Sequence, residues 1–388
     1  MKFCFPRTYY ESALQFRLQS AAFPAPFTVN QKTYRLPWPG PNHSPLATDL
    51  TLIQTDSEVR KLLVVTSGLH GVELFAGSAV QCRLMERLRV GGGGLGKAAV
   101  LLVHAVNPFG SAWVRRTNGE NVDLTRNCFP DFPTALEAYK GNKDLQGPAE
   151  LYSRLNSFIN PVTLGAADKA QAQFLVLRYG TTALRRALLI GQRANNTGIS
   201  YGGLTLQPEI ALLHTALLTL IQPFQASLQS ILHLDIHTGW GGYGEMLALV
   251  DDQPSALVLR ELGVQVDKSG FGEKCLVPGP EVGCFSNLQH LLALPVPFRS
   301  ATLEFGTRDE LELFWTLRAE NNHHNSTSLQ AYIHSEIPRF DYKAYLSHPS
   351  KATFVEAFSP VDLSWQSSVL QQGSALCLRA LHSLASSS

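Results

Sequence analysis

The chain has 388 residues, 45% of them hydrophobic, which is enough apolar material for one large buried core or two smaller ones. Its 32 Lys and Arg residues nearly balance 31 Asp and Glu residues, and the formal net charge of +1 gives no reason to expect binding to nucleic acid or to an anionic membrane surface. Any functional assignment must therefore come from a candidate site.

No segment has the pattern of a targeting signal or a membrane span. Residues 1–16 carry Lys2, Arg7 and Glu11 and lack the unbroken apolar stretch of a signal peptide. A run of about 18 uncharged apolar residues occurs nowhere in the sequence. The six cysteines are scattered without CxxC pairs, at positions 4, 82, 128, 275, 284 and 377. This spacing favours reduced thiols, and we expect a cytoplasmic protein that does not bind a membrane.

The first clear pattern is a strand, a helix and a second strand. Residues 61–68 are a short apolar, β-branched run ending in Ser-Gly, which predicts a buried strand entering a loop. Apolar residues at helical spacing follow over 73–88, and four glycines at 91–94 interrupt them. A second buried strand is predicted over 98–106. This order predicts a βαβ crossover and a parallel or mixed sheet covered by helices.

The middle of the chain has a different character. Residues 135–226 are rich in helix-forming sequence, and we interpret them as a helical insertion within one domain that spans residues 1–388. The predicted helices are 151–159, 166–179 and 207–220, with a Gly- and Asn-rich piece, 191–203, between the last two. Strand patterns resume at 230–236, 245–250 and 299–305. After about residue 325 the pattern is mixed, and we expect the Ser-rich end to be frayed.

His70 and Glu73 lie in the loop after the first predicted strand, where open α/β sheets place their ligand sites. Three positions apart on a turn that contains Gly71, an imidazole nitrogen and a carboxylate oxygen can reach one ion. On this fragment alone, an ordinary helix N-terminus with an acidic residue in its first turn is the better explanation.

His237 strengthens the case for a metal, because it also stands at the mouth of an apolar strand and is followed by glycines. Two histidines and a carboxylate, with a fourth position open, are the donor set of a catalytic zinc site. His233, Asp235 and His237 share one face of the predicted strand. His233 could be the ligand instead, but it lies deeper, and a hydrogen-bonded core histidine is the stronger interpretation.

Glu304 is flanked by apolar residues at the end of another predicted strand. Burial raises the pKa of a carboxyl group, and such a group beside an activated water can accept a proton and pass it to a leaving amine. The alternative is an exposed glutamate on an edge strand.

Three arginines, Arg115, Arg116 and Arg126, lie among polar residues and glycines in a segment that we call the arginine loop (residues 107–129). Arginine binds carboxylates and oxyanions through paired hydrogen bonds, so this loop suits substrate recognition. A solvated loop without a function would have a similar composition.

Two weaker candidates accompany these motifs. His323 and His324 are adjacent, and neighbouring positions on a helix point about 100° apart, so the pair would chelate one ion poorly. We expect them at the surface. Trp240 and Tyr243 could line a pocket, although aromatic residues of this kind belong as often to the core.

The four motifs, in this order, resemble the zinc carboxypeptidase superfamily, which includes the succinylglutamate desuccinylase and aspartoacylase branch. The resemblance extends over roughly residues 62–307 and looks strongest to a bacterial branch with a helical insertion after the arginine loop. It implies an α/β fold of the zinc carboxypeptidase-like, phosphorylase/hydrolase-like kind: a mixed, mostly parallel sheet of about eight strands between helices, with the metal at the carboxyl ends of central strands.

The resemblance also implies roles for individual residues. The ligands of one Zn²⁺ ion are matched by His70, Glu73 and His237, and the general base and acid by Glu304. The arginine that pairs with a substrate carboxylate is matched by Arg126, the arginine that stabilises the oxyanion by Arg116 or Arg115, and the carboxylate that orients the first histidine ligand by Asp123.

The chain departs from the family pattern at two positions. Thr125 stands where the family has Asn immediately before the carboxylate-binding arginine. The tyrosine that covers the substrate has no obvious match, since Tyr243 is the only tyrosine between His237 and Glu304 and lies very close to the ligand. Thr125 and Tyr243 are kept as candidate substrate-binding residues, and hydrolysis follows from the resemblance more directly than peptidase activity does.

We therefore expect a zinc-dependent hydrolase that cleaves an amide bond in a small molecule or peptide carrying a carboxylate. An N-acyl amino acid deacylase is a second hypothesis, and a non-catalytic metal- or ligand-binding module is a third. Glu304 argues against the third, because a binding module needs no general base. Specificity is expected to depend on the insertion and on residues 275–291.

Overall fold

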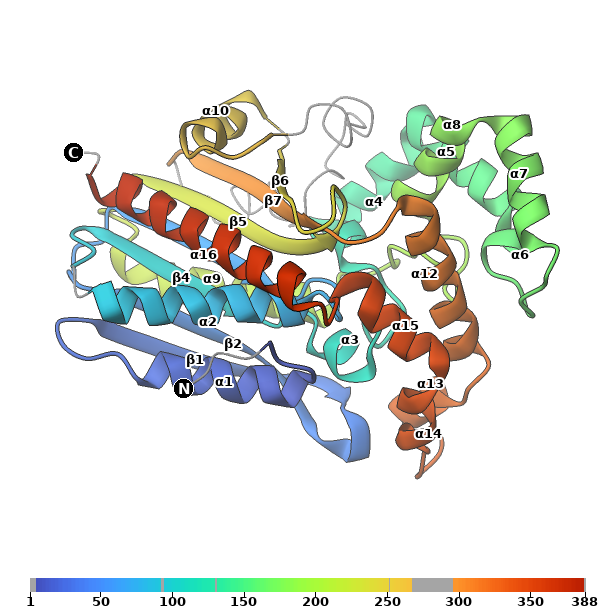
Figure 1. Cartoon of the computed structure of the whole chain (residues 1–388), viewed down its shortest axis with the longest axis horizontal. Coiled ribbons are helices and arrows are strands. Elements are labelled where there is room, and N and C mark those ends of the chain that lie inside the picture. The colour runs from blue at the N-terminus through green and yellow to red at the C-terminus, as the bar shows by residue number, and fades with distance from the viewer. Residues whose placement is uncertain (1–4, 92–93, 130, 251, 267–295, 387–388) are drawn as a thin grey trace.

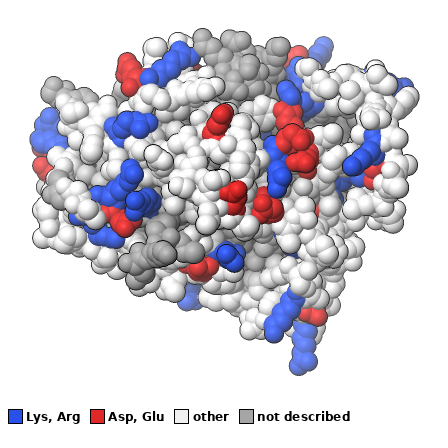
Figure 2. Space-filling view, viewed as in Figure 1, with Lys and Arg blue, Asp and Glu red and all other residues white. Residues whose placement is uncertain are grey.

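The computed structural model describes residues 5–91, 94–129, 131–250, 252–266 and 296–386. Figure 1 shows a twisted sheet between helices, with a separate group of helices beyond one of its ends. Within the described ranges, every helix is too short or too polar to span a lipid bilayer. On the face drawn in Figure 2, acidic and basic side chains are interspersed. Residues 275–291 lie outside the described ranges.

The sheet has seven strands in the described part of the chain, against about eight expected. They are β1 (Thr28–Pro39), β2 (Pro45–Gln54), β3 (Lys61–Ser67), β4 (Ala98–His104), β5 (Ser230–Gly239), β6 (Met246–Leu249) and β7 (Phe298–Gly306). Their order is β1-β2-β4-β3-β5-β7-β6, and β4, β3, β5 and β7 are mutually parallel. The outer pairs are antiparallel. The carboxyl ends of β3, β5 and β7 therefore meet at one edge of the sheet.

Helices cover both faces of the sheet. Alternate residues of each central strand point to opposite faces, so an apolar strand presents apolar side chains on both sides, and both sides must be buried. On one face, Leu63 and Val65 of β3 share a core with α1 (Tyr9–Ala21), α2 (Leu74–Gly91) and α16 (Leu363–Ser386). On the other face, Leu62 and Val64 pack with residues of α9 (Pro208–Ile221). Burial on both faces explains why β3 is an unbroken apolar run in the sequence.

Most of the remaining helices lie near the end of the sheet where the parallel strands finish (Figure 1), whereas the helix at residues 253–261 packs beside the start of β7. Five belong to the predicted insertion: α4 (Phe132–Gly141), α5 (Lys143–Arg154), α6 (Asn156–Ile159), α7 (Asp168–Tyr179) and α8 (Thr181–Leu189). The others are α3 (Pro108–Trp113), α10 (Gln253–Glu261), α12 (Glu310–Asn325), α13 (Leu329–Ile333), α14 (Tyr342–Ser347) and α15 (Pro349–Phe358), with short 3-10 turns η1 (Pro41–His43), η2 (Leu124–Arg126) and η3 (Gln222–Phe224). Buried residues of α5 to α8 form a cluster separate from the sheet core.

Most predicted elements form within a few residues of their expected ends, including all five strands that the sequence indicated. The pattern did not indicate α1, β1 or β2. The expectation of a frayed end is wrong for the described residues, because α16 continues to Ser386. The expectation of reduced thiols holds for Cys82 and Cys377, which are free and buried, but not for Cys128, which is disulfide-bonded.

Gly71 permits the loop after β3 to touch the arginine loop. A Cβ atom at position 71 would lie 2.0 Å from the carbonyl carbon of Gly110 and 2.2 Å from the carbonyl oxygen of Arg115. The Gly71 N–H donates to the Arg116 carbonyl oxygen at 3.4 Å. No residue with a side chain fits there without moving backbone, so two loops that carry candidate site residues are held together through this position.

We expect Gly71→Ala to lower the free energy of unfolding by about 3 kcal/mol, because the new methyl group meets main-chain atoms that cannot move aside cheaply. Urea denaturation measures the change. Gly141→Ala at the end of α4 is the matched control, since nothing lies within 4 Å of the added Cβ. Alanine loses less backbone conformational entropy on folding than glycine does, so that variant should be more stable than the parent by about 0.5 to 1 kcal/mol. Equal stability of the two variants would contradict the close packing at Gly71.

Candidate metal centre

His70, Glu73 and His237 form a buried cluster at the carboxyl edge of the sheet. His70 and Glu73 follow β3 directly, and His237 lies near the end of the adjacent parallel strand β5. One ligand atom from each residue lies within 4.8 Å of the others. The two carboxylate oxygens of Glu73 divide between the imidazoles: Oε1 is 2.9 Å from His70 Nδ1, and Oε2 is 2.9 Å from His237 Nδ1.

The second nitrogen of each imidazole has a polar partner of its own. His70 Nε2 lies 2.8 Å from Thr125 Oγ1 and 3.3 Å from Asp123 Oδ1. His237 Nε2 lies 2.7 Å from Asp235 Oδ2. When these partners accept the Nε2 proton, both Nδ1 lone pairs face the same point beside Glu73. Two nitrogens and one oxygen so arranged fit a divalent cation such as Zn²⁺, with room in its coordination shell for a further ligand.

The charges of the cluster also favour a cation. Burial opposes ionisation of Glu73, but the neighbouring imidazoles of His70 and His237 outweigh it and hold the pKa of Glu73 below its ordinary value. For Asp123 the guanidinium groups of Arg116 and Arg126 overcome burial and lower the pKa well below its usual range. In the opposite sense, Asp235 and Glu73 outweigh burial and raise the pKa of His237 well above its ordinary value. Several ionised carboxylates thus surround the two imidazoles.

Glu304 lies beside the cluster on the neighbouring strand. In the parallel register of β5 and β7, Glu304 is the partner of His237, so the two side chains emerge on the same face of the sheet. Burial, together with the nearby charge of Glu73, raises the pKa of Glu304 to about 7. The Trp240 N–H donates to Glu304 Oε2 at 3.4 Å. Glu304 is therefore a carboxyl group that can change its protonation state near neutral pH.

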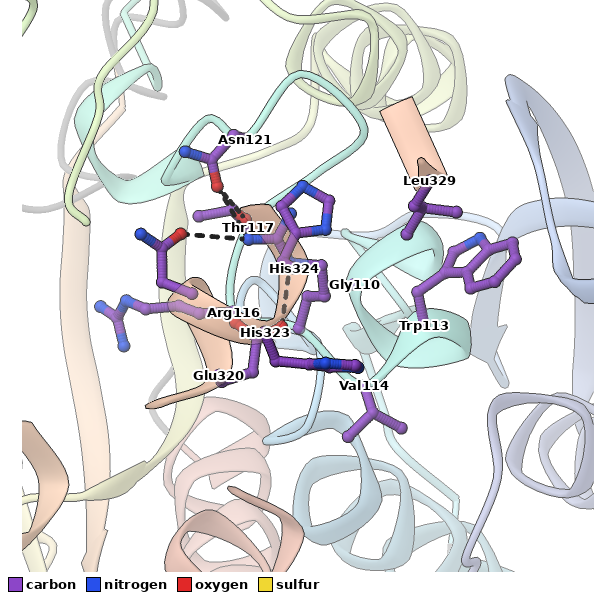
Figure 3. A network of polar contacts seen from close by, with 12 residues as sticks. Gly110, Trp113, Val114, Arg116, Thr117, Asn121, Glu320, His323, His324 and Leu329 are labelled. Atoms are coloured by element: carbon purple, nitrogen blue, oxygen red, sulfur yellow. Dashed lines mark hydrogen bonds and ion pairs between the residues drawn. The ribbon is translucent and has the colours of Figure 1, made fainter. Parts of the chain in front are cut away.

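The structure distinguishes the two adjacent arginines. Arg116 reaches the cluster, with Nε 3.0 Å from Asp123 Oδ2 and Nη1 3.4 Å from Glu73 Oε1. Arg115 instead is fully buried, and its Nε lies 3.2 Å from Glu320 Oε1. Figure 3 shows the network around Glu320, with the Arg116 side chain extending away from Trp113 and Leu329.

The network around Arg115 anchors the arginine loop to the C-terminal helices. Lys351 Nζ donates to Glu320 Oε1 at 2.6 Å and to the carbonyl oxygens of Trp113 and Val114 at 3.3 and 3.1 Å. Val114 ends α3 in the left-handed conformation, with φ 53°. The chain is therefore held on both sides of this turn, immediately before Arg116.

The predicted substrate-binding residues fall in different places. Arg126 belongs to η2, and its charge helps to lower the pKa of Asp123. Thr125 contacts His70, so it stands next to the candidate metal ligands. The side chain of Tyr243 is 49% exposed, and the charged groups that act on it are Asp362, Glu356 and Arg308. Among the described residues, neither Arg115 nor Tyr243 makes a hydrogen bond or ion pair to the cluster.

His233 is the hydrogen-bonded core histidine that the sequence favoured. Its Nε2 lies 2.9 Å from Thr66 Oγ1 and its Nδ1 lies 3.0 Å from Ser300 Oγ. Burial lowers its pKa to about 4, so the ring is neutral.

The expected surface position of the other histidine pair is wrong. His324 is buried beside Tyr345, and the half-buried His323 ring stacks on His348 with centroids 3.8 Å apart. Both rings pack where α12 meets α14 and α15, which the pair alone could not indicate.

Asp235 is the site residue to which sequence reasoning assigned no role. It accepts from Thr66 Oγ1 at 2.6 Å as well as contacting His237. The signal was present, because a carboxylate two positions before a histidine on one strand face can reach its ring. The hydroxyl of Thr66 comes from the adjacent strand β3, and only the strand pairing reveals it.

The fold and this cluster define an α/β protein with a candidate metal centre at the carboxyl edge of a mixed sheet. The model of the family described as "Protein of unknown function (DUF2817)" matches residues 5–372, and the chain belongs to that family. A search of curated proteins found no match.

Several solved structures are similar to this chain at low identity. A metallo-carboxypeptidase from Pseudomonas aeruginosa is 12% identical with a TM-score of 0.43, covering 96% of this chain and 68% of that one. Carboxypeptidase A from Helicoverpa armigera is 14% identical with a TM-score of 0.43, covering 95% and 73%. Succinylglutamate desuccinylase from Chromobacterium violaceum is 14% identical with a TM-score of 0.34, covering 85% and 77%. These are the two kinds of protein that the sequence motifs resemble.

Metal binding should release a proton. The raised pKa of His237 means that its ring carries a proton at pH 7 in the metal-free protein, whereas a metal binds the neutral ring. Apparent affinity for Zn²⁺ should therefore rise with pH until the pH passes that pKa. Calorimetric titration at pH 7 in buffers of different ionisation enthalpy should show about one proton released per ion.

Asp235→Asn tests the cause of this linkage. It removes the carboxylate that raises the pKa of His237, so it should reduce proton release and weaken Zn²⁺ binding about 10-fold to 100-fold. Asp309→Asn, which keeps a capping side chain at the start of α12, should bind Zn²⁺ as the parent does. Unchanged affinity and proton release in Asp235→Asn would refute the role given to Asp235.

Proposed function

We propose that this chain is a zinc-dependent hydrolase that cleaves an amide bond close to a carboxylate of its substrate. The observation that carries the proposal is the position of Glu304, which is partly buried, lies opposite His237 on the neighbouring strand and has its pKa raised to about 7. A module that only binds a metal gains nothing from a proton acceptor at that point.

The roles of the chain's own groups follow from their positions. His70, Glu73 and His237 would hold the ion. Bound Zn²⁺ supplies the Lewis acidity that activates water near neutral pH. Glu304 accepts the proton of the attacking water and returns it to the leaving nitrogen, and a pKa of about 7 suits both transfers. Arg116, whose guanidinium lies beside Glu73, stabilises the negative charge that develops on the carbonyl oxygen.

Arg126 gives the proposal its substrate class. As a fixed cation next to Asp123, it supports recognition of a carboxylate near the scissile bond. Peptides with a free C-terminus and N-acyl amino acids both carry such a group. Assaying the zinc-loaded protein against C-terminally varied dipeptides and N-acyl amino acids separates the peptidase from the deacylase.

Glu304→Gln is expected to keep its zinc and to lose activity about 100-fold or more, because the amide cannot accept a proton. Metal content by mass spectrometry and turnover on the best substrate of that panel measure the two effects. Glu261→Gln, at an exposed position of α10, is the control and should match the parent. Unchanged turnover in Glu304→Gln would defeat the hydrolase proposal, and so would a zinc-loaded parent that cleaves no member of the panel.

The two adjacent arginines should respond differently to the same change. Arg116→Met should lower kcat about 100-fold, because one stabiliser of the oxyanion is removed. It should also cost stability, because the buried Asp123 loses a cation partner. Arg115→Met should lower the free energy of unfolding by about 3 kcal/mol, because Glu320 loses one of its buried cations, and should leave turnover per folded molecule unchanged. Turnover per folded molecule and urea denaturation measure both variants. A reversed pattern would mean that Arg115 is the arginine that acts on substrate.

A further inference from the structure

The Gly- and Asn-rich segment of the insertion, residues 191–203, lies against the arginine loop and is called the covering loop here. Polar contacts join the two loops at successive positions. The Asp123 N–H donates to the Tyr201 carbonyl oxygen at 2.7 Å. Asn121 Nδ2 donates to the carbonyl oxygens of Asn196 and Gly198 at 2.9 and 3.0 Å. The covering loop therefore supports the segment that carries Asp123 and Arg126.

Arg193 makes the densest set of contacts within this junction. Its Nη1 donates to the carbonyl oxygens of Gly202 and Gly203, both at 2.6 Å, and its Nη2 donates to the Arg126 carbonyl oxygen at 2.8 Å. Its guanidinium also lies over two aromatic rings of α4, Phe132 at 5.4 Å and Tyr139 at 5.1 Å. The planar guanidinium has five N–H donors in a fixed fork, so it can donate to three carbonyl oxygens while its face lies over the aromatic rings.

The covering loop also touches the side chain of Arg126 itself. A Cβ atom built on Gly191 would lie 3.1 Å from both Cγ and Cδ of Arg126. A Cβ atom on Gly202 would lie 3.0 Å from Arg126 Cβ and 2.7 Å from Arg193 Nη1. Two glycines thus bring the main chain onto the aliphatic part of Arg126, and Arg193 holds one of them in place. The direction of the Arg126 guanidinium depends on this packing.

We propose that Arg193 is a positioning residue for Arg126: by fastening the covering loop to η2, it sets the preference of the site for substrates that carry a carboxylate. This inference rests on the proposed function, in which Arg126 binds that carboxylate. Arg193 itself contacts main chain and aromatic rings, so it acts through Arg126.

A double-mutant cycle tests the proposal by binding rather than by turnover. Zinc-loaded full-length Glu304→Gln protein serves as the parent, and calorimetry gives Kd for N-benzoylglycyl-L-phenylalanine and for its C-terminal amide. The ratio of the two Kd values is the carboxylate preference. Arg126→Ala should reduce it about tenfold or more, since a hydrogen bond to a charged group is lost. Arg193→Ala should reduce it about threefold to tenfold, and should have no further effect once Arg126 is removed.

Controls separate positioning from general damage. Arg154→Ala removes another arginine of the insertion, whose side chain is 70% exposed, and should leave the preference unchanged. Zinc content should equal that of the parent in every variant. Arg193→Lys keeps the charge and should retain part of the preference, and it replaces Arg193→Ala in the cycle if that variant does not fold.

Each remaining outcome has one meaning. A preference lost in Arg126→Ala but kept in Arg193→Ala and Arg193→Lys overturns the inference and leaves the proposed function intact. An equal effect of the Arg193 substitution with and without Arg126 also overturns it, because Arg193 would then act independently. If Arg126→Ala leaves the preference unchanged, or the parent shows none, the substrate class proposed above is wrong and the inference falls with it.

Discussion

The site depends on one carboxylate placed between two imidazoles. Each oxygen of Glu73 lies 2.9 Å from an Nδ1 atom, one from the loop after β3 and one from β5. A buried glutamate is costly unless opposing charge or hydrogen bonds compensate it. Here the imidazoles provide that compensation. Asp123 and Asp235 contact the Nε2 atoms of His70 and His237, on the side of each ring away from Glu73. The arrangement leaves the Nδ1 atoms of both imidazoles directed at one point.

Support for this cluster comes from parts of the chain that are distant in sequence. Gly71 brings the His70 loop against the arginine loop, and the Arg115, Glu320 and Lys351 network fixes that loop to the C-terminal helices. From the other side, the covering loop of the insertion holds the same segment through Arg193 and Asn121. The arginine loop is thus held by the C-terminal helices on one side and by the covering loop on the other. Its arginines therefore occupy defined positions even though the loop contains only short helical turns.

Local sequence pattern was enough to predict what a strand or loop shows by itself. The apolar runs of β3 and β5 and the polar residues at their ends indicated both the sheet and the cluster of His70, Glu73 and His237. The edge strand β1 escaped prediction because it is largely exposed and carries polar residues and prolines. The sequence also could not separate Arg115 from Arg116, because their partners, Glu320 of α12 and Asp123 of the arginine loop, are brought to them by the tertiary structure. The burial of His324 required knowledge of α14 and α15, and the coupling of Thr66 to Asp235 required the strand pairing.

The strand order β3-β5-β7 has a consequence for how the protein matures. The ligands and Glu304 are joined only when segments more than 60 residues apart have paired, and such long-range pairing is slow because loop entropy is lost before contacts form. A chain still emerging from the ribosome, or one truncated before β7, cannot contain the assembled centre. A metal held by this cluster would thus be captured at the end of folding, and by mass action it would then favour the completed structure over every partly folded form.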